Sequence, residues 1–153
     1  ETLIVGCGIR TNLKGVKEVE RILLGLDSKI KVIPIFMKKQ SRYYHLDTCQ
    51  LRLPNSEMSL IYPEAFEAEG VEALKKLGRV EMISNEEAKH FPCNGLVINE
   101  DTIFMPWVND RIRGKISEAG YHNIETFPMS EFMKSGGAVK CLVLEHDFAL
   151  GAR

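Results

Sequence analysis

The stretch KSGGAVKCLVLE, residues Lys134–Glu145, decides how the rest of this 153-residue chain is interpreted. Two adjacent glycines, Gly136 and Gly137, precede a short apolar run, Val139–Leu144, whose composition predicts a strand. Glycine permits a positive φ and a close approach of the backbone to another group. Cys141, a few residues past such a bend, can therefore point into a cleft. The simpler alternative is that Cys141 is a small buried core residue, as free cysteines commonly are.

The composition is that of an ordinary globular protein. The hydrophobic fraction is 44%, the charged fraction 27% and the net charge −1, so no basic surplus indicates a nucleic-acid partner. The apolar runs are too short to cross a bilayer, and no signal-peptide pattern is visible. The four cysteines are dispersed and form no CxxC pair, which argues against a structural zinc site. We expect one cytoplasmic domain over residues 1–153, with reduced thiols, no metal and no cofactor.

Hydrophobic periodicity and turn residues predict a chain of alternating strands and helices. The predicted strands are Leu3–Val5, Ile30–Phe36, His45–Arg52, Ser59–Tyr62, Arg79–Ser84, Gly95–Asn99, Thr102–Met105, Ile124–Phe127 and Val139–Leu144. The predicted helices are Leu13–Leu26 with Asn12 as its N-cap, Val71–Leu77, Val108–Ala119, and short turns at Asn85–Lys89 and after Ser130.

One supersecondary unit repeats along this chain. The order strand–strand–helix–strand occurs from His45 to Ser84 and again from Gly95 to Phe127, after a strand–helix–strand piece. The cysteines recur at intervals of 42, 44 and 48 residues, close to the length of the unit. Such a repeat is typical of a propeller or an array. The predicted fold class is therefore α/β, built from repeated ββαβ units.

A histidine and an aspartate lie two positions apart in the predicted strand that begins at His45. On a strand, His45 and Asp47 would share one face, with Leu46 on the other. Such a pair can supply a proton donor and acceptor beside a carboxylate that holds a cation. The alternative is a surface pair at the start of a strand.

Three motifs together resemble those of a known family. They are Arg10-Thr11-Asn12, His45-x-Asp47 and Gly136-Gly137-x-x-x-Cys141. From about Leu3 to Glu145 the chain is similar to the penteins, a guanidino-group-modifying superfamily that includes arginine deiminase, glycine amidinotransferase and dimethylarginine dimethylaminohydrolase. The resemblance implies a propeller of five ββαβ units, which would be incomplete in this chain.

The resemblance also implies a role for each of the four residues. Cys141 would attack the guanidinium carbon as a thiolate, and His45 would act as the acid and base. Asp47 would hold the guanidinium N–H groups, and Arg10 would pair with the α-carboxylate of an amino-acid substrate. The alternative for Arg10 is an exposed arginine that precedes a helix.

The expected function is hydrolysis of the guanidino group of arginine or a methylated or related arginine, giving a citrulline-type product. One alternative is an amidinotransferase that passes the amidino group to an amine; another is a non-catalytic binding fragment. In the family an acidic site residue precedes the segment matched here. We therefore expect this chain to be the C-terminal part of a longer enzyme, completed by further chain, a second chain or a homo-oligomer.

Overall fold

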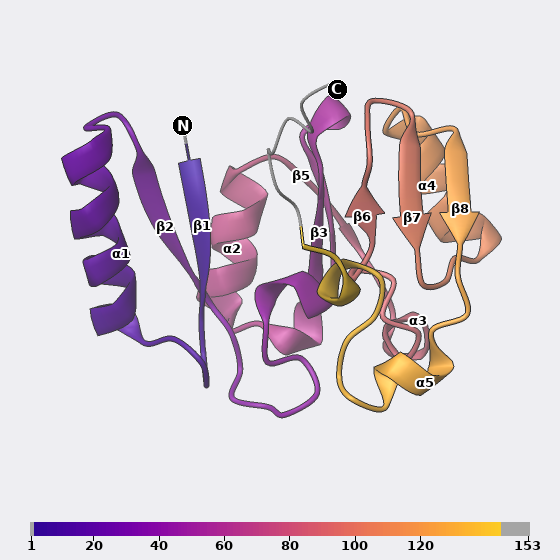
Figure 1. The fold of residues 1–153 in the computed structure, drawn as a ribbon, viewed down its shortest axis with the longest axis horizontal. Helices are drawn as coiled ribbons and strands as arrows, with labels where there is room; N and C mark the ends of the chain where they lie inside the picture. The colour runs from indigo at the N-terminus through magenta and orange to yellow at the C-terminus, as the bar shows by residue number, and fades with distance from the viewer. Residues whose placement is uncertain (1, 145–153) are drawn as a thin grey trace, which may run out of the picture.

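The computed structural model describes residues 2–144, which form three small sheets arranged side by side in the order of the chain (Figure 1). The strands are β1 Thr2–Cys7, β2 Lys31–Phe36, β3 Gln50–Leu53, β4 Met58–Ile61, β5 Arg79–Met82, β6 Leu96–Val97, β7 Thr102–Met105 and β8 Asn123–Thr126. The α-helices are α1 Leu13–Leu26, α2 Ala68–Lys76, α3 Asn85–Ala88, α4 Asp110–Glu118 and α5 Ser130–Met133.

The first sheet pairs β1 with β2 in parallel, and α1 connects them. Asn12 caps α1 as predicted, because its Oδ1 accepts from the backbone N of Lys14 at 3.0 Å and of Gly15 at 3.1 Å. Pro34 lies in β2, which is an edge strand of this two-stranded sheet, where a residue without an N–H is tolerated.

The predicted ββαβ repeat is confirmed in the other two sheets. In each, the first two strands are antiparallel and the second and third are parallel, as in β3-β4-β5 and β6-β7-β8. Cys49 and Cys93 lie just before the first strand of their units, and both are buried. Cys7 instead lies at the end of β1. Because β1 and β2 are parallel, as β4 and β5 are, β1 corresponds to the second strand of a repeat, and Cys7 is not equivalent in position to Cys49 and Cys93.

The strand predicted from His45 to Arg52 is wrong in its first half. Residues Leu46–Thr48 form a turn of 3₁₀-helix, and β3 begins only at Gln50. The backbone N of Thr48 donates to the carbonyl O of His45 at 3.1 Å, and Thr48 Oγ1 donates to the same oxygen at 2.6 Å. These local hydrogen bonds compete with strand pairing, so the argument that His45 and Asp47 share a strand face does not hold.

The strand predicted at Val139–Leu144 is also wrong. Residues Lys140–Leu142 form a turn of 3₁₀-helix, in which the N of Leu142 donates to the O of Val139 at 3.2 Å. The N of Lys140 donates to the carbonyl O of Asn94 at 3.1 Å, in a loop far away in sequence. This tertiary contact outweighs the strand propensity of the segment.

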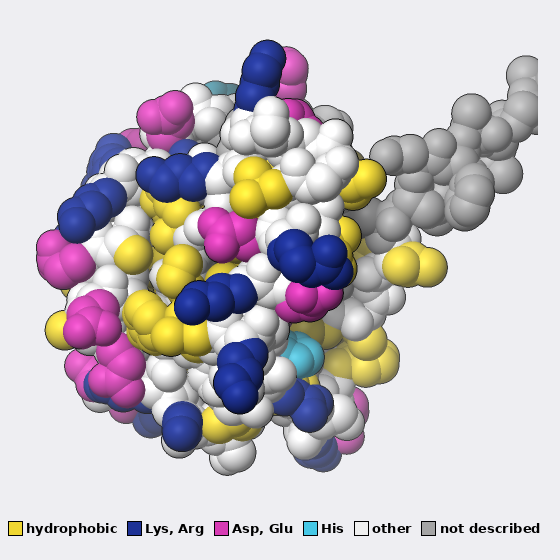
Figure 2. Space-filling model, turned by 90° about the vertical axis from the view of Figure 1, so that its left-hand side faces the viewer, with side chains coloured by type: hydrophobic (Ala, Val, Ile, Leu, Met, Phe, Trp, Pro, Cys, Tyr) yellow, Lys and Arg dark blue, Asp and Glu magenta, His cyan; other side chains and the backbone are white. Residues whose placement is uncertain are grey.

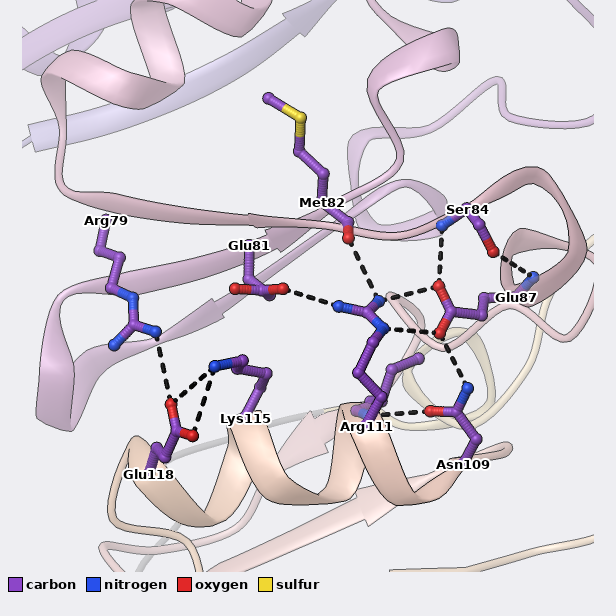
Figure 3. A network of polar contacts seen from close by, with 10 residues as sticks. Arg79, Glu81, Met82, Ser84, Glu87, Asn109, Arg111, Lys115 and Glu118 are labelled. Carbon is purple, nitrogen blue, oxygen red and sulfur yellow. Dashed lines mark hydrogen bonds and ion pairs between the residues drawn. The ribbon is translucent and has the colours of Figure 1, made fainter.

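The second and third sheets are joined by a polar network around Arg111 of α4 (Figure 3). Arg111 forks onto Glu87, with its Nη2 2.8 Å from Oε2 and its Nε 3.0 Å from Oε1, and its Nη1 lies 2.7 Å from Glu81 Oε1. Asn109 Nδ2 adds a hydrogen bond of 2.8 Å to Glu87. The Arg111 guanidinium, with help from these donors, holds the pKa of Glu87 down at about 2, because it stabilises the carboxylate.

One continuous apolar core lies between the helices and the sheets and includes Ile112 and Ile116, the predicted inner face of α4. Helix α1, unlike α4, leaves some of its large apolar side chains exposed to solvent, namely Leu13, Ile22 and Leu26. Figure 2 shows this side of the molecule, with hydrophobic side chains uncovered between charged ones. Within residues 2–144, none of the helices has the length and apolar character needed to cross a membrane.

Candidate active site

Cys141 and Asp47, 94 positions apart in the chain, meet at the surface. Cys141 Sγ lies 3.6 Å from Asp47 Oδ2, and the cysteine is exposed. Asp47 is held in the 3₁₀ turn before β3, and Cys141 in the 3₁₀ turn that replaces the predicted last strand. Because Cys141 is exposed, a ligand from solvent can reach its sulfur, and the adjacent carboxylate of Asp47 favours a ligand with positive charge.

Asn94 lies between these two turns and contacts both of them. Its side chain is fully buried. Its Nδ2 donates to the carbonyl O of Asp47 at 3.0 Å and to Cys141 Sγ at 3.2 Å. Its Oδ1 accepts from the backbone N of Ala138 at 2.7 Å and of Cys141 at 3.4 Å. One amide therefore fastens the loop of the thiol to the loop of the carboxylate.

The two glycines before Cys141 are required by close contacts. A Cβ on Gly137 would lie 2.7 Å from Cys141 Cβ and 3.0 Å from Cys141 Sγ. Gly136 has a φ of +89°, in the left-handed region that glycine favours, and a Cβ there would lie 3.1 Å from the ring of Tyr44. The predicted bend is confirmed at Gly136, and Gly137 packs directly against Cys141.

Asp47 also lines a groove of about 380 Å³. It is lined by Arg10, Tyr44, His45 and Asp47, among others. The central carbon of the Arg10 guanidinium lies 5.3 Å from the centroid of the Tyr44 ring, and the rings of Tyr44 and His45 are 4.3 Å apart. Asp47 is therefore the residue that the thiol and the groove share.

Charge and burial set the protonation of the thiol. Partial burial raises the pKa of Cys141, and the negative charge of Asp47 raises it further, while hydrogen bonds from Asn94 and from the backbone of Ala138 act in the opposite direction. Within residues 2–144, Asp47 Oδ1 is buried and accepts no hydrogen bond. A bound cation that donates to Asp47 would remove the charge that holds the proton on the sulfur.

The structure thus brings all four predicted site residues to one region. Asp47 contacts Cys141, and Asp47, His45 and Arg10 line one groove. Sequence reasoning did not identify Asn94 or Tyr44. Asn94 lies in the loop before β6, and no periodicity marks an asparagine whose partners are distant in sequence. No cluster of three or more potential metal ligands occurs among the described residues.

Solved structures of other proteins share the fold of this chain. The N-terminal domain of the cyanobacterial arginine dihydrolase ArgZ, bound to its product, superimposes with a TM-score of 0.79 and 30% sequence identity, covering 92% of this chain and 50% of that one. A variant of the same domain, covalently bound to a reaction intermediate, also gives a TM-score of 0.79. The fold is therefore that of the penteins, and the chain spans about half of that domain.

The chain belongs to the arginine deiminase family, whose sequence model matches residues 1–99. The bifunctional arginine dihydrolase/ornithine cyclodeaminase ArgZ of Synechocystis is 39% identical over 106 residues, which are 67% of this chain and 15% of that protein. The dimethylarginine dimethylaminohydrolase of Mycobacterium tuberculosis is 29% identical over 147 residues, 95% of this chain and 45% of that enzyme. The family is one of hydrolases that act on guanidino groups.

Proposed function

We propose that this chain carries the nucleophile and part of the substrate site of a hydrolase that acts on arginine or a methylated or related arginine. The carrying observation is the contact of 3.6 Å between Cys141 Sγ and Asp47 Oδ2, at the edge of the groove that Asp47 shares with His45 and Arg10. A guanidinium held by Asp47 would present its central carbon to that sulfur. The covalent intermediate found in the ArgZ domain supports the same chemistry here.

In the first half-reaction, the substrate guanidinium donates its N–H groups to Asp47. Neutralising this carboxylate lowers the pKa of the Cys141 thiol, its proton passes to solvent, and the thiolate attacks the guanidinium carbon while His45 is protonated. A C–S bond forms, and the bond from this carbon to one nitrogen breaks. His45 gives its proton to the departing amine.

In the second half-reaction, neutral His45 removes a proton from water, which attacks the carbon of the amidino-thioether. The C–O bond forms, the C–S bond breaks and the thiolate is regenerated. The product is a urea of the citrulline type. Amidino transfer would differ in both halves: the bond from the carbon to the side-chain nitrogen would break first, and an amine instead of water would then attack the amidino-thioether.

Arg10 points to a substrate that has a carboxylate. Arg10 is exposed, its guanidinium lies over the Tyr44 ring, and it lines the same groove as Asp47. A planar guanidinium binds a carboxylate through two parallel hydrogen bonds. A free amino acid would satisfy both Asp47 and Arg10, whereas a decarboxylated analogue such as agmatine would leave Arg10 without an anion.

We propose further that groups outside residues 2–144 complete the guanidinium clamp, from a longer chain or from a second copy. Asp47 supplies one carboxylate, and a trigonal guanidinium presents N–H groups on three sides. The chain spans half of the solved ArgZ domain, which supports this proposal.

The direct test is covalent labelling of the full-length protein with 2-chloroacetamidine, followed by peptide mass spectrometry. The label should fall on Cys141 and be lost in Cys141→Ser, while Cys7→Ser should label like the parent protein. A label confined to another cysteine would refute the assignment of the nucleophile.

The reaction type is tested by incubation with arginine and with N-methylarginine. Citrulline formed in water, with no new guanidino product when glycine is added, is the result expected for the hydrolase. Transfer of the amidino group to glycine would identify an amidinotransferase. A full-length protein that reacts with 2-chloroacetamidine but turns over neither substrate would instead have a binding function without catalysis.

A further inference from the structure

We propose that Asn94 is the positioning residue that holds Cys141 and Asp47 in register and keeps an N–H donor on the reacting sulfur. This inference deepens the proposed function and rests on it for the identity of the reaction. Asn94 comes from the turn before β6, whereas Cys141 and Asp47 come from two other turns. It is the fully buried side chain through which these turns are joined.

The backbone partners fix which end of the amide faces the sulfur. The N–H groups of Ala138 and Cys141 can only donate, so the atom that meets them at 2.7 and 3.4 Å is the oxygen Oδ1. The carbonyl of Asp47 can only accept, so the atom 3.0 Å from it is the nitrogen Nδ2. The contact of 3.2 Å between Nδ2 and Cys141 Sγ is therefore a donated hydrogen bond to sulfur.

This donor and the carboxylate act on different protonation states of the thiol. As a thiol, Cys141 donates its S–H to Asp47 Oδ2 at 3.6 Å. As a thiolate, it cannot donate and gains from an N–H that points at it. Once a guanidinium occupies Asp47, Asn94 remains hydrogen-bonded to the sulfur, so it stabilises the form that attacks.

Asn94 also determines where the sulfur lies. Its carbonyl O accepts from the N of Lys140 at 3.1 Å, in addition to the two N–H groups that its side chain accepts. Three backbone N–H groups, those of Ala138, Lys140 and Cys141, therefore donate to a single residue. Loss of these contacts would let the thiol move away from Asp47, and nucleophilic attack is sensitive to displacements of about 1 Å.

The test is the pH dependence of Cys141 alkylation by iodoacetamide in the 153-residue chain, followed by peptide mass spectrometry. The substitution Asn94→Asp keeps the acceptor Oδ1 and replaces the donor by an acceptor. We expect the midpoint to move to higher pH and the rate at pH 7.5 to fall about 10-fold, since a hydrogen bond to a charged group has this order of strength. An unchanged midpoint and rate would overturn the proposal.

The matched control is Asn55→Asp. Asn55 Nδ2 donates to the carbonyl O of Glu100 and so also links two repeats, through a side chain that is exposed where that of Asn94 is buried. This variant reports the cost of exchanging an amide for an acid in a contact between repeats. Alkylation of Cys141 should be the same in Asn55→Asp as in the parent chain; an equal slowing in both variants would mean that Asn94 is only structural.

A second measurement needs no variant at position 94, in case Asn94→Asp does not fold. The side-chain amide resonances of Asn94 in ¹⁵N–¹H spectra of the parent chain should titrate with the alkylation midpoint of Cys141, and this titration should vanish in Cys141→Ala. Resonances that do not respond to thiol ionisation would refute the proposal. Neither measurement requires turnover. Absence of guanidino hydrolase activity in the full-length protein would contradict the proposed function, while the role of Asn94 would still be decided by these two measurements.

Discussion

The guanidinium of Arg10 lies over the ring of Tyr44, with its central carbon 5.3 Å from the ring centroid. The same ring lies 4.3 Å from that of His45, and a Cβ at Gly136 would come within 3.1 Å of it. The ring of Tyr44 therefore packs against Arg10, His45 and the glycine bend at Gly136. A residue with this position has consequences for substrate binding.

We predict that Tyr44→Ala raises KM for arginine about 5-fold or more, because Arg10 loses its cation–π contact and His45 its neighbour. Tyr44→Phe keeps the ring and should stay within about 2-fold of the parent enzyme. Steady-state kinetics of the full-length enzyme measure both. Equal KM values for Tyr44→Ala and the parent would show that the ring does not position Arg10.

A methyl group at position 137 should disable the thiol. We expect Gly137→Ala to slow alkylation of Cys141 by at least about 10-fold, since the new Cβ would lie 2.7 Å from Cys141 Cβ and displace the sulfur. Gly25→Ala is the matched control, because nothing lies within 4 Å of a Cβ there and alanine is favoured in helix α1. Normal alkylation in Gly137→Ala would mean that the bend can adapt without moving Cys141.

The negative charge of Asp47 should affect the pH at which the Cys141 thiol ionises. Partial burial and then Asp47 raise the pKa of Cys141, so Asp47→Asn should move the midpoint of Cys141 alkylation to lower pH. The same variant should lose turnover, because the guanidinium loses its carboxylate. A midpoint that stays in place would show that Asp47 does not act on the sulfur through its charge.

Stability in acid should depend on the pair of Arg111 and Glu87. The pKa of Glu87 is lowered from its ordinary value of 4.5 to about 2 in the folded chain, so its contribution is complete above about pH 4.5 and is lost as the pH falls towards 2. We expect Arg111→Ala to reduce the free energy of unfolding at pH 7 by about 2 kcal/mol and to flatten its fall across this window.

The control for this experiment is Arg79→Ala, which removes the exposed pair of Arg79 and Glu118. Exposed pairs contribute less than about 1 kcal/mol, so this variant should follow the parent closely. Urea unfolding at pH 7, 4 and 3 gives the comparison. Identical curves for Arg111→Ala and Arg79→Ala would show that the contacts of Arg111 with Glu81 and Glu87 add nothing beyond a surface contact such as that of Arg79 with Glu118, which Figure 3 also draws.

The order of helices and strands was predictable from the sequence because each element has its own local pattern of hydrophobic spacing and capping residues. Helix α1 has an apolar stripe and the N-cap Asn12, and α4 buries Ile112 and Ile116 as its periodicity indicates. Hydrophobic spacing and capping act over a few residues, so they remain readable without knowledge of the fold. The residue types of the site were predictable for a related reason, since a thiol, an imidazole and a carboxylate have few chemical substitutes.

The sequence by itself determined the repeated ββαβ units, the glycine bend before Cys141 and the identities of Arg10, His45, Asp47 and Cys141 as candidates. Only the tertiary structure decided that Val139–Leu144 turns instead of extending, that Asp47 lies inside a 3₁₀ turn that follows His45, and that Asn94 joins the loops. The physical reason is that the loops are joined by hydrogen bonds between positions 47 residues apart, Asn94 to Asp47 and Asn94 to Cys141. No local pattern encodes such pairs, because their energy exists only once the chain has brought them together.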